Sequence, residues 1–157
     1  MTTAILQIKG LSLLIRNMAI FCLTHGGHLY SGWCATKLFK YLSFQWISGN
    51  VVIVHSGPDI AGVFIAWPDF TWEIERRERA NEFHFNWRLN IEGGDALMVA
   101  DVIVIKEGNN LTRLLQLASA RWPDWKMRRI CTHRRGKLVE LSQPALARFF
   151  HEQPQGS

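Results

Sequence analysis

Apolar side chains recur at helical spacing through the first part of the chain. Between Ala4 and Leu23 they fall three or four residues apart, although Gly10 weakens the middle of this pattern. The polar, glycine-containing segment 24–28 interrupts it, and a second helical pattern then runs from Gly32 to Ile47. We therefore expect an N-terminal helix, a loop and a second helix.

The pattern then changes to runs that are typical of strands. Val51–His55 and Ile60–Trp67 are rich in β-branched and aromatic residues, and the turn-forming sequence Ser56–Asp59 separates them. Pro68–Asp69 is expected to end the second run, because proline cannot donate a hydrogen bond to a neighbouring strand. These residues predict a β-hairpin.

A long apolar run near residue 100 predicts a buried central strand. Ala96–Ile105 is mostly apolar and β-branched, and it follows a Gly-Gly-Asp turn. A polar turn, Lys106–Asn110, leads into an apolar pattern at helical spacing that stops at Pro123. Asp101 lies inside the apolar run, so its carboxylate must find a partner or shift its pKa. It is the most informative polar residue of this stretch.

The remaining segments complete one mixed domain. Residues 73–79 are charged and helix-forming, whereas 83–89 alternate, so we expect a short helix or a loop followed by an extended segment. Residues 125–132 and 138–141 are expected to be strands on either side of a basic turn, Arg134–Lys137. The predicted fold class is α/β, with a mixed, mostly antiparallel sheet flanked by helices.

We expect a single domain over residues 1–157. It has its N-terminal helix within residues 1–23, a short terminal helix near 144–150 and a loose tail at 151–157. Hydrophobic residues make up 48% of the chain and charged residues 20%, which excludes a disordered protein. The apolar stretch 11–23 contains an arginine and is too short for a transmembrane segment, leaving peripheral membrane contact as a minor alternative.

The net charge and the cysteines indicate which binding partners and which cellular compartment to expect. The net charge of +5 favours an anionic partner, such as nucleic acid, an anionic membrane face, a phosphorylated cofactor or an acidic carrier protein, and ordinary surface charge is the equal alternative. Cys22, Cys34 and Cys131 are widely spaced, without metal-ligand spacing or a disulfide pattern. We read them as small core residues and expect a reducing, cytoplasmic location.

Several short motifs follow one another in a particular order and spacing along the chain. His28 precedes the second helix and the hairpin, Gly94–Asp95 is followed after five residues by Asp101, the central helix ends at Trp122–Pro123, and Gly136–Lys137 precedes an apolar strand. From about Thr24 to Leu141, this order resembles the toxin-activating lysine acyltransferases of bacteria. They are a divergent branch of the Gcn5-related N-acetyltransferase (GNAT) superfamily.

The resemblance implies a GNAT-like fold and an acyltransferase activity. Members of this branch lack the usual pyrophosphate-binding loop and take a fatty acyl group from acyl carrier protein for transfer to a lysine amine of a protein acceptor. Lys106–Asn110 has one glycine where the usual superfamily members have two or three. We therefore expect no tightly bound cofactor and an acyl carrier protein thioester as donor, with acyl-CoA as the alternative.

Acyl transfer to an amine needs a base and a group that orients it. His28 stands where the resemblance places the catalytic histidine, with His25 as the alternative base, and Asp101 would orient the imidazole and stabilise its charged form. The plainer interpretations are a polar loop histidine and a structural carboxylate. His25 and His28 also have a spacing found in metal sites, but no third ligand is near in the sequence, so we expect no metal.

Two further sets of residues are candidate binding groups. Asn109 and Asn110 stand where the central helix begins: Asn110 is expected to cap it, and the helix end would bind a phosphate or phosphopantetheine group. The second set is a basic cluster that consists of Arg128, Arg129, Arg134, Arg135 and Lys137. It would bind an acidic carrier protein or nucleic acid, and the alternative is an ordinary charged surface in contact with water.

Three functional hypotheses remain open at this point. The first is the carrier-dependent acyltransferase. The second is a non-enzymatic module of the same fold that binds nucleic acid or an acidic protein through the basic cluster. The third is a coenzyme A-dependent N-acetyltransferase with an unusual turn at Lys106–Asn110. The sequence leaves a homodimer open.

Overall fold

The computed structural model of the protein describes residues 3–27, 29–80, 94–134 and 137–142. The order of elements along the chain is the one that the sequence predicts, with a short helix in the charged segment. The elements are α1 (Thr3–His25), α2 (Ala35–Ile47), β1 (Val51–Ser56), β2 (Asp59–Asp69), α3 (Thr71–Arg79), β3 (Ala96–Val104), α4 (Asn110–Arg121), the 3-10 helix η1 (Trp125–Met127), β4 (Arg129–Arg134) and β5 (Lys137–Leu141).

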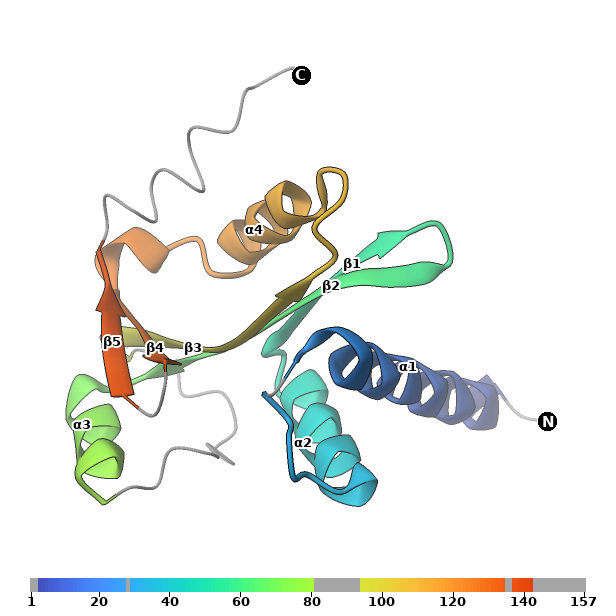
Figure 1. Ribbon diagram of the computed structural model, residues 1–157, viewed down its shortest axis with the longest axis horizontal. Helices are drawn as coiled ribbons and strands as arrows, with labels where there is room; N and C mark the ends of the chain where they lie inside the picture. The colour runs from blue at the N-terminus through green and yellow to red at the C-terminus, as the bar shows by residue number, and fades with distance from the viewer. Residues whose placement is uncertain (1–2, 28, 81–93, 135–136, 143–157) are drawn as a thin grey trace.

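The strands form one sheet that is covered on both faces. In the described part of the chain its order is β1-β2-β3-β4-β5, and every neighbouring pair is antiparallel except β3 and β4, which are parallel. Helices α1 and α2 lie against one face, and α4 lies against the other (Figure 1). The predicted mixed α/β class with a mostly antiparallel sheet is confirmed.

Each face of the sheet has its own apolar core. The core under α1 and α2 includes Met18, Leu42 and Ile65, all nearly inaccessible to water. The core under α4 includes Leu114 and Trp122, which are equally buried. Because β3 contributes side chains to both cores, it must be apolar on both faces, and this explains its near-continuous apolar sequence.

A β-bulge interrupts the alternation of β3 next to Asp101. Ile65 pairs with Asp101 and Ala66 pairs with Val99, so Ala100 is an extra residue on this strand. Ala100 packs in the core under α1 and α2, and Asp101 points to that same face, where it meets α2. Without the extra residue, strict alternation would turn Asp101 toward α4.

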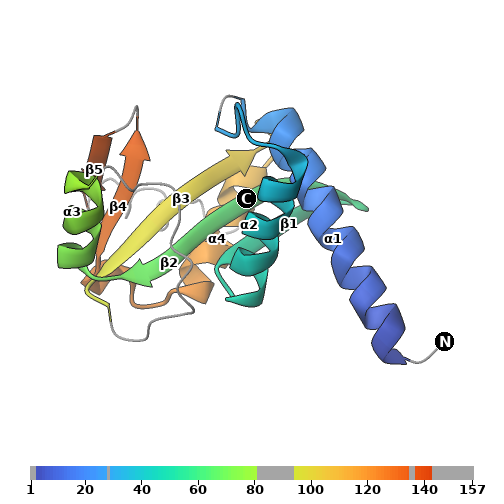
Figure 2. The ribbon, with the colours of Figure 1, turned by 90° about the horizontal axis from the view of Figure 1, so that it is seen from below.

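The parallel pair β3–β4 is short. Only Ala96–Val99 pair with Arg129–Thr132, and β3 then continues to Val104 without β4 beside it. Figure 2 shows the two strands diverging toward their carboxyl ends. The edge of β3 that faces away from β2 therefore has no strand partner beyond Val99 within the described residues.

Strand β2 ends at Asp69, as the Pro68–Asp69 pair predicts. Proline is tolerated inside the strand because β1 begins opposite Ile65, so only β3 flanks β2 at Pro68. Two other local predictions are wrong. Helix α2 begins at Ala35, three residues later than predicted. Residues 125–127 form η1 and not the start of a strand. The extended segment predicted at 83–89, and the helix and tail predicted after residue 143, lie outside the described residues.

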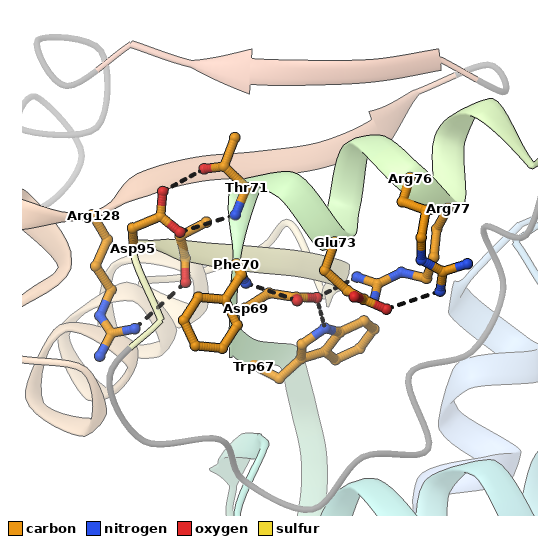
Figure 3. Close-up of polar contacts among 10 residues, drawn as sticks. Trp67, Asp69, Phe70, Thr71, Glu73, Arg76, Arg77, Asp95 and Arg128 are labelled. Atoms are coloured by element: carbon orange, nitrogen blue, oxygen red, sulfur yellow. Dashed lines mark hydrogen bonds and ion pairs between the residues drawn. The ribbon is translucent and has the colours of Figure 1, made fainter.

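The start of β3 is tied to the end of β2 and to α3. A Cβ atom on Gly94 would lie 2.2 Å from the backbone oxygen of Asp69, so only glycine allows this approach. Asp95 accepts hydrogen bonds from the amide and hydroxyl of Thr71, at 2.9 and 2.6 Å, at the first turn of α3 (Figure 3). A guanidinium nitrogen of Arg128 donates to the Gly94 oxygen at 2.7 Å. Gly94–Asp95 is thus a structural junction.

Replacing Gly94 with alanine is expected to destabilise the protein by about 3 kcal/mol, because the new methyl group meets rigid backbone. Urea unfolding followed by circular dichroism measures the loss. The matched control is Gly10→Ala in α1, where a Cβ atom meets nothing within 4 Å and stability should rise by about 0.5–1 kcal/mol. Equal stability of the two variants would contradict the close approach.

Candidate functional site

Asp101 is held by a tyrosine from α2. Tyr41 is buried, with 3% of the residue exposed. Its hydroxyl donates a hydrogen bond to Asp101 Oδ2 at 3.0 Å. Burial raises the pKa of the Asp101 carboxyl above its ordinary value, and the neighbouring hydroxyls of Tyr30 and Tyr41 oppose this rise only in part. The sequence predicts that Asp101 either finds a partner or shifts its pKa, and in the structure it does both.

Tyr30 and Cys22 complete a buried polar cluster around Asp101. The Tyr30 side chain is buried, and its hydroxyl makes no hydrogen bond of normal geometry among the described residues, although it is close enough to Asp101 for each group to shift the other's pKa. Burial, and after it the charge of Asp101, raise the pKa of the Cys22 thiol to about 12. Cys22 is thus a protonated, unreactive core residue at neutral pH.

The other two cysteines divide between core and surface. Cys131 is buried, as predicted, and Cys34 is exposed, so its interpretation as a core residue is wrong. All three are free thiols. Cys34 precedes the first residue of α2, where an extended backbone leaves the side chain outside the core.

The loop after α1 lies against β3 on both sides of residue 28. A Cβ atom on Gly26 would lie 3.2 Å from the Ile103 side chain and 2.4 Å from the Cys22 oxygen, so the chain turns tightly against the strand here. Two residues after position 28, Tyr30 stands beside Asp101. His28 itself lies outside the described residues. The pairing of His28 with Asp101 therefore stays a prediction.

The alternative base, His25, is exposed. It lies in the last turn of α1, with its ring centroid 4.8 Å from that of Phe21. Cys22, one turn earlier, is buried, and the charge of Asp101 contributes to its raised pKa. The structure thus brings Asp101 together with Tyr41, Tyr30 and Cys22.

The two asparagines at the start of α4 have different surroundings. The prediction that Asn110 caps the helix is wrong: it is the first helical residue, and its side-chain amide donates to the backbone oxygen of Glu107 at 2.9 Å. Asn110 is buried and stabilises the turn, in which Gly108 adopts a left-handed φ of 73°. Asn109 occupies the cap position, is exposed and makes no side-chain cap bond. Of the two, Asn109 is the residue that a ligand would reach.

Two arginines of the predicted basic cluster form ion pairs with carboxylates. Arg128 pairs with Asp124 at 2.9 Å, and Arg129 pairs with Glu140 at 2.7 Å. Both arginines line an open depression of about 700 Å³ that also contains Asp95, Glu140 and the exposed Lys126. Lys137 is exposed at the start of β5, whereas Arg135 and the side chain of Arg134 lie outside the described residues.

A second buried cluster was missed at the sequence level. Asp69, inaccessible to water, accepts hydrogen bonds from Trp67 Nε1 and the Phe70 amide and forms a close ion pair with Arg77 (Figure 3). Glu73 is also buried and bonds Arg76 at 2.8 Å. The spacing of Glu73, Arg76 and Arg77 indicates helical ion pairs, but nothing in the sequence shows that the carboxylates are buried. This cluster joins α3 to the end of β2.

Comparison with family models, curated proteins and solved structures gave no match in any of the three. Among the described residues, no group of three or more His, Cys, Asp and Glu side chains could hold a metal ion. The Asp101 cluster is therefore the candidate site, because it joins a shifted carboxylate to the loop that contains the predicted base.

Replacing Tyr41 with phenylalanine is expected to lower the free energy of unfolding by about 1.5–3 kcal/mol, because Asp101 loses its hydrogen bond. Tyr30→Phe is the matched control. Its hydroxyl has no bond of normal geometry to lose, so its cost should be below about 1 kcal/mol. Urea unfolding of both variants at neutral pH makes the comparison, and a larger loss for Tyr30→Phe would reverse the assignment of the two tyrosines.

The stability of the Asp101→Asn variant, measured against that of the wild type, should increase as the pH rises. The folded-state pKa of Asp101 lies above its ordinary value of 3.8, so the folded state holds this proton more tightly than the unfolded state. Wild-type stability therefore falls as the pH rises from about 3.8 through the folded-state pKa, and asparagine removes this loss. Unfolding of both proteins between acidic and neutral pH measures the difference, and a pH-independent difference would contradict the raised pKa.

Proposed function

We propose that the protein is an acyltransferase that moves an acyl group from a carrier thioester to a lysine amine of a protein acceptor. The observation that carries this proposal is the position of Asp101. It is turned by the bulge at Ala100 toward the loop after α1 and hydrogen-bonded to Tyr41. The order of the elements, with β3 followed by a short turn and α4, supports the GNAT-like fold that the resemblance implies.

In the proposed reaction, His28 removes a proton from the amine, which attacks the thioester carbon. The C–S bond then breaks, and the carrier thiolate leaves and takes up a proton. Asp101 orients the imidazole and stabilises its positive charge. An unpaired buried carboxylate would itself hold the proton, so the Tyr41 hydrogen bond favours the charged form that this role requires.

The free edge of β3 supports a donor with an extended arm. Beyond Val99 this edge has no strand partner within the described residues, so its amide and carbonyl groups can bond an extended chain that carries amides. The phosphopantetheine arm of acyl carrier protein is such a chain. The turn before α4 has one left-handed glycine, and the Asn110 amide is occupied within it. This favours a carrier protein over a donor held by its pyrophosphate.

The activity test uses the protein with acyl carrier protein loaded with a fatty acyl group and a lysine-containing peptide as acceptor. Asp101→Asn should lower the rate of transfer about 10²–10⁴-fold, because the imidazole loses the charge that stabilises its protonated form. The matched control is Glu107→Ala, an exposed carboxylate in the turn before α4, which should leave the rate unchanged. A wild-type rate for Asp101→Asn would remove Asp101 from the mechanism.

Two further measurements separate the alternatives. Loss of activity in His28→Ala, but not in His25→Ala, assigns the base. Coenzyme A should give no thermal stabilisation if the donor is a carrier protein, and a dose-dependent rise in the melting temperature would favour a coenzyme A-dependent enzyme instead.

A further inference from the structure

Helix α1 has large apolar side chains on the side that faces away from the core. Leu13, Ile20 and Leu23 are 53%, 55% and 52% exposed. At 100° per residue they lie opposite Ile15 and Met18, which are buried against the rest of the protein. An ordinary surface helix has polar residues there, so α1 is apolar on its outer face as well as its inner one.

The same outer face is basic. Lys9 and Arg16 fall among the exposed apolar residues by helical spacing, and both are exposed. The chain contains no Asp or Glu before Asp59, whereas four cations precede it: Lys9, Arg16, Lys37 and Lys40. These four account for most of the net charge of +5. The excess of positive charge therefore comes from the part of the sequence that forms α1 and α2.

The shape of the molecule leaves this face accessible. Figure 2 shows the N-terminal half of α1 projecting past the sheet and past α2. On the opposite, inner side of α1, an apolar groove of about 230 Å³ lies between α1 and α2. Its lining includes Leu11, Ile15, Phe39, Trp46 and Ile47. Ile47, at the end of α2, is 70% exposed.

We propose that the outer face of α1 binds the surface of an anionic lipid bilayer, with the helix lying in the interface. Leu13, Ile20 and Leu23 enter the boundary between headgroups and acyl chains, and Arg16 stays among the lipid phosphates. The binding is peripheral, because no described helix is long and apolar enough to cross a membrane. This inference does not depend on the proposed acyl transfer.

The charge of this face favours lipid over the other occupants. A second copy of the chain, docked through the same face, would bring two acid-free basic helices together and repel itself. Nucleic acid would satisfy the cations but would leave three large aliphatic side chains exposed to water, since stacking on bases needs aromatic or guanidinium planes. An anionic bilayer satisfies both the cations and the aliphatic groups.

The test is co-sedimentation of the full chain with vesicles. The vesicles are equal parts phosphatidylcholine and phosphatidylglycerol in one arm and phosphatidylcholine alone in the other. We expect binding to the anionic vesicles that weakens as salt is added. Arg16→Glu should weaken it about 25-fold, since one attraction is lost and one repulsion is gained. Ile20→Ser should weaken it about tenfold through the lost aliphatic carbons.

The matched control is Met127→Ser on η1. Met127 is 88% exposed, so this variant removes an equally accessible apolar side chain from another part of the surface and should bind as the wild type does. Circular dichroism confirms that each variant keeps its helices. Unchanged binding by both Arg16→Glu and Ile20→Ser would overturn the proposal, as would absence of binding to the anionic vesicles at low salt. A concentration-dependent dimer in sedimentation velocity that Ile20→Ser dissociates would overturn it in favour of self-association.

Discussion

The extra residue at Ala100 is the constraint on which the arrangement of the centre depends. It places two consecutive side chains, those of Ala100 and Asp101, on the face covered by α1 and α2. Before the bulge, Leu97 and Val99 belong to the core under α4. After the bulge, Ile103 belongs to the core under α1 and α2. One insertion in the ladder thus turns a carboxylate toward a tyrosine while both apolar cores stay intact.

A fully buried carboxylate, Asp69, and a partly buried one, Asp101, meet the cost of leaving water in two different ways. Asp69 has an arginine, an indole and a backbone amide as partners, and these contacts offset the loss of water around its carboxyl group. Asp101 accepts a hydrogen bond from the Tyr41 hydroxyl. Burial raises the pKa of its carboxyl group, and the tyrosine hydroxyls oppose this rise only in part. The first arrangement stabilises a junction between elements, and the second leaves a carboxylate that responds strongly to a positive charge placed beside it.

The sequence predicts the elements well because their signals are local. The hairpin around Gly57, the apolar run of β3 and the helical spacing of α4 each appear in the structure. The bulge at Ala100 could not be predicted, since it depends on pairing with Ile65 on a distant strand. The burial of Glu73 and the bond from Tyr41 to Asp101 are hidden for the same reason, because both arise from contacts between elements far apart in sequence. The candidate carboxylate was thus predictable, but its partners were not.

Charge gives the clearest case in which the structure changes an interpretation of the sequence. The arginines near residue 130 are the densest basic cluster in the chain, yet Arg128 and Arg129 are each paired with a carboxylate, at Asp124 and Glu140. Most of the net charge comes instead from the acid-free first 58 residues. A dense cluster of cations that is interleaved with acids projects little field, whereas a few cations without acids project more. The excess of positive charge therefore lies in the part of the chain that forms α1 and α2, on the same side of the sheet as Asp101.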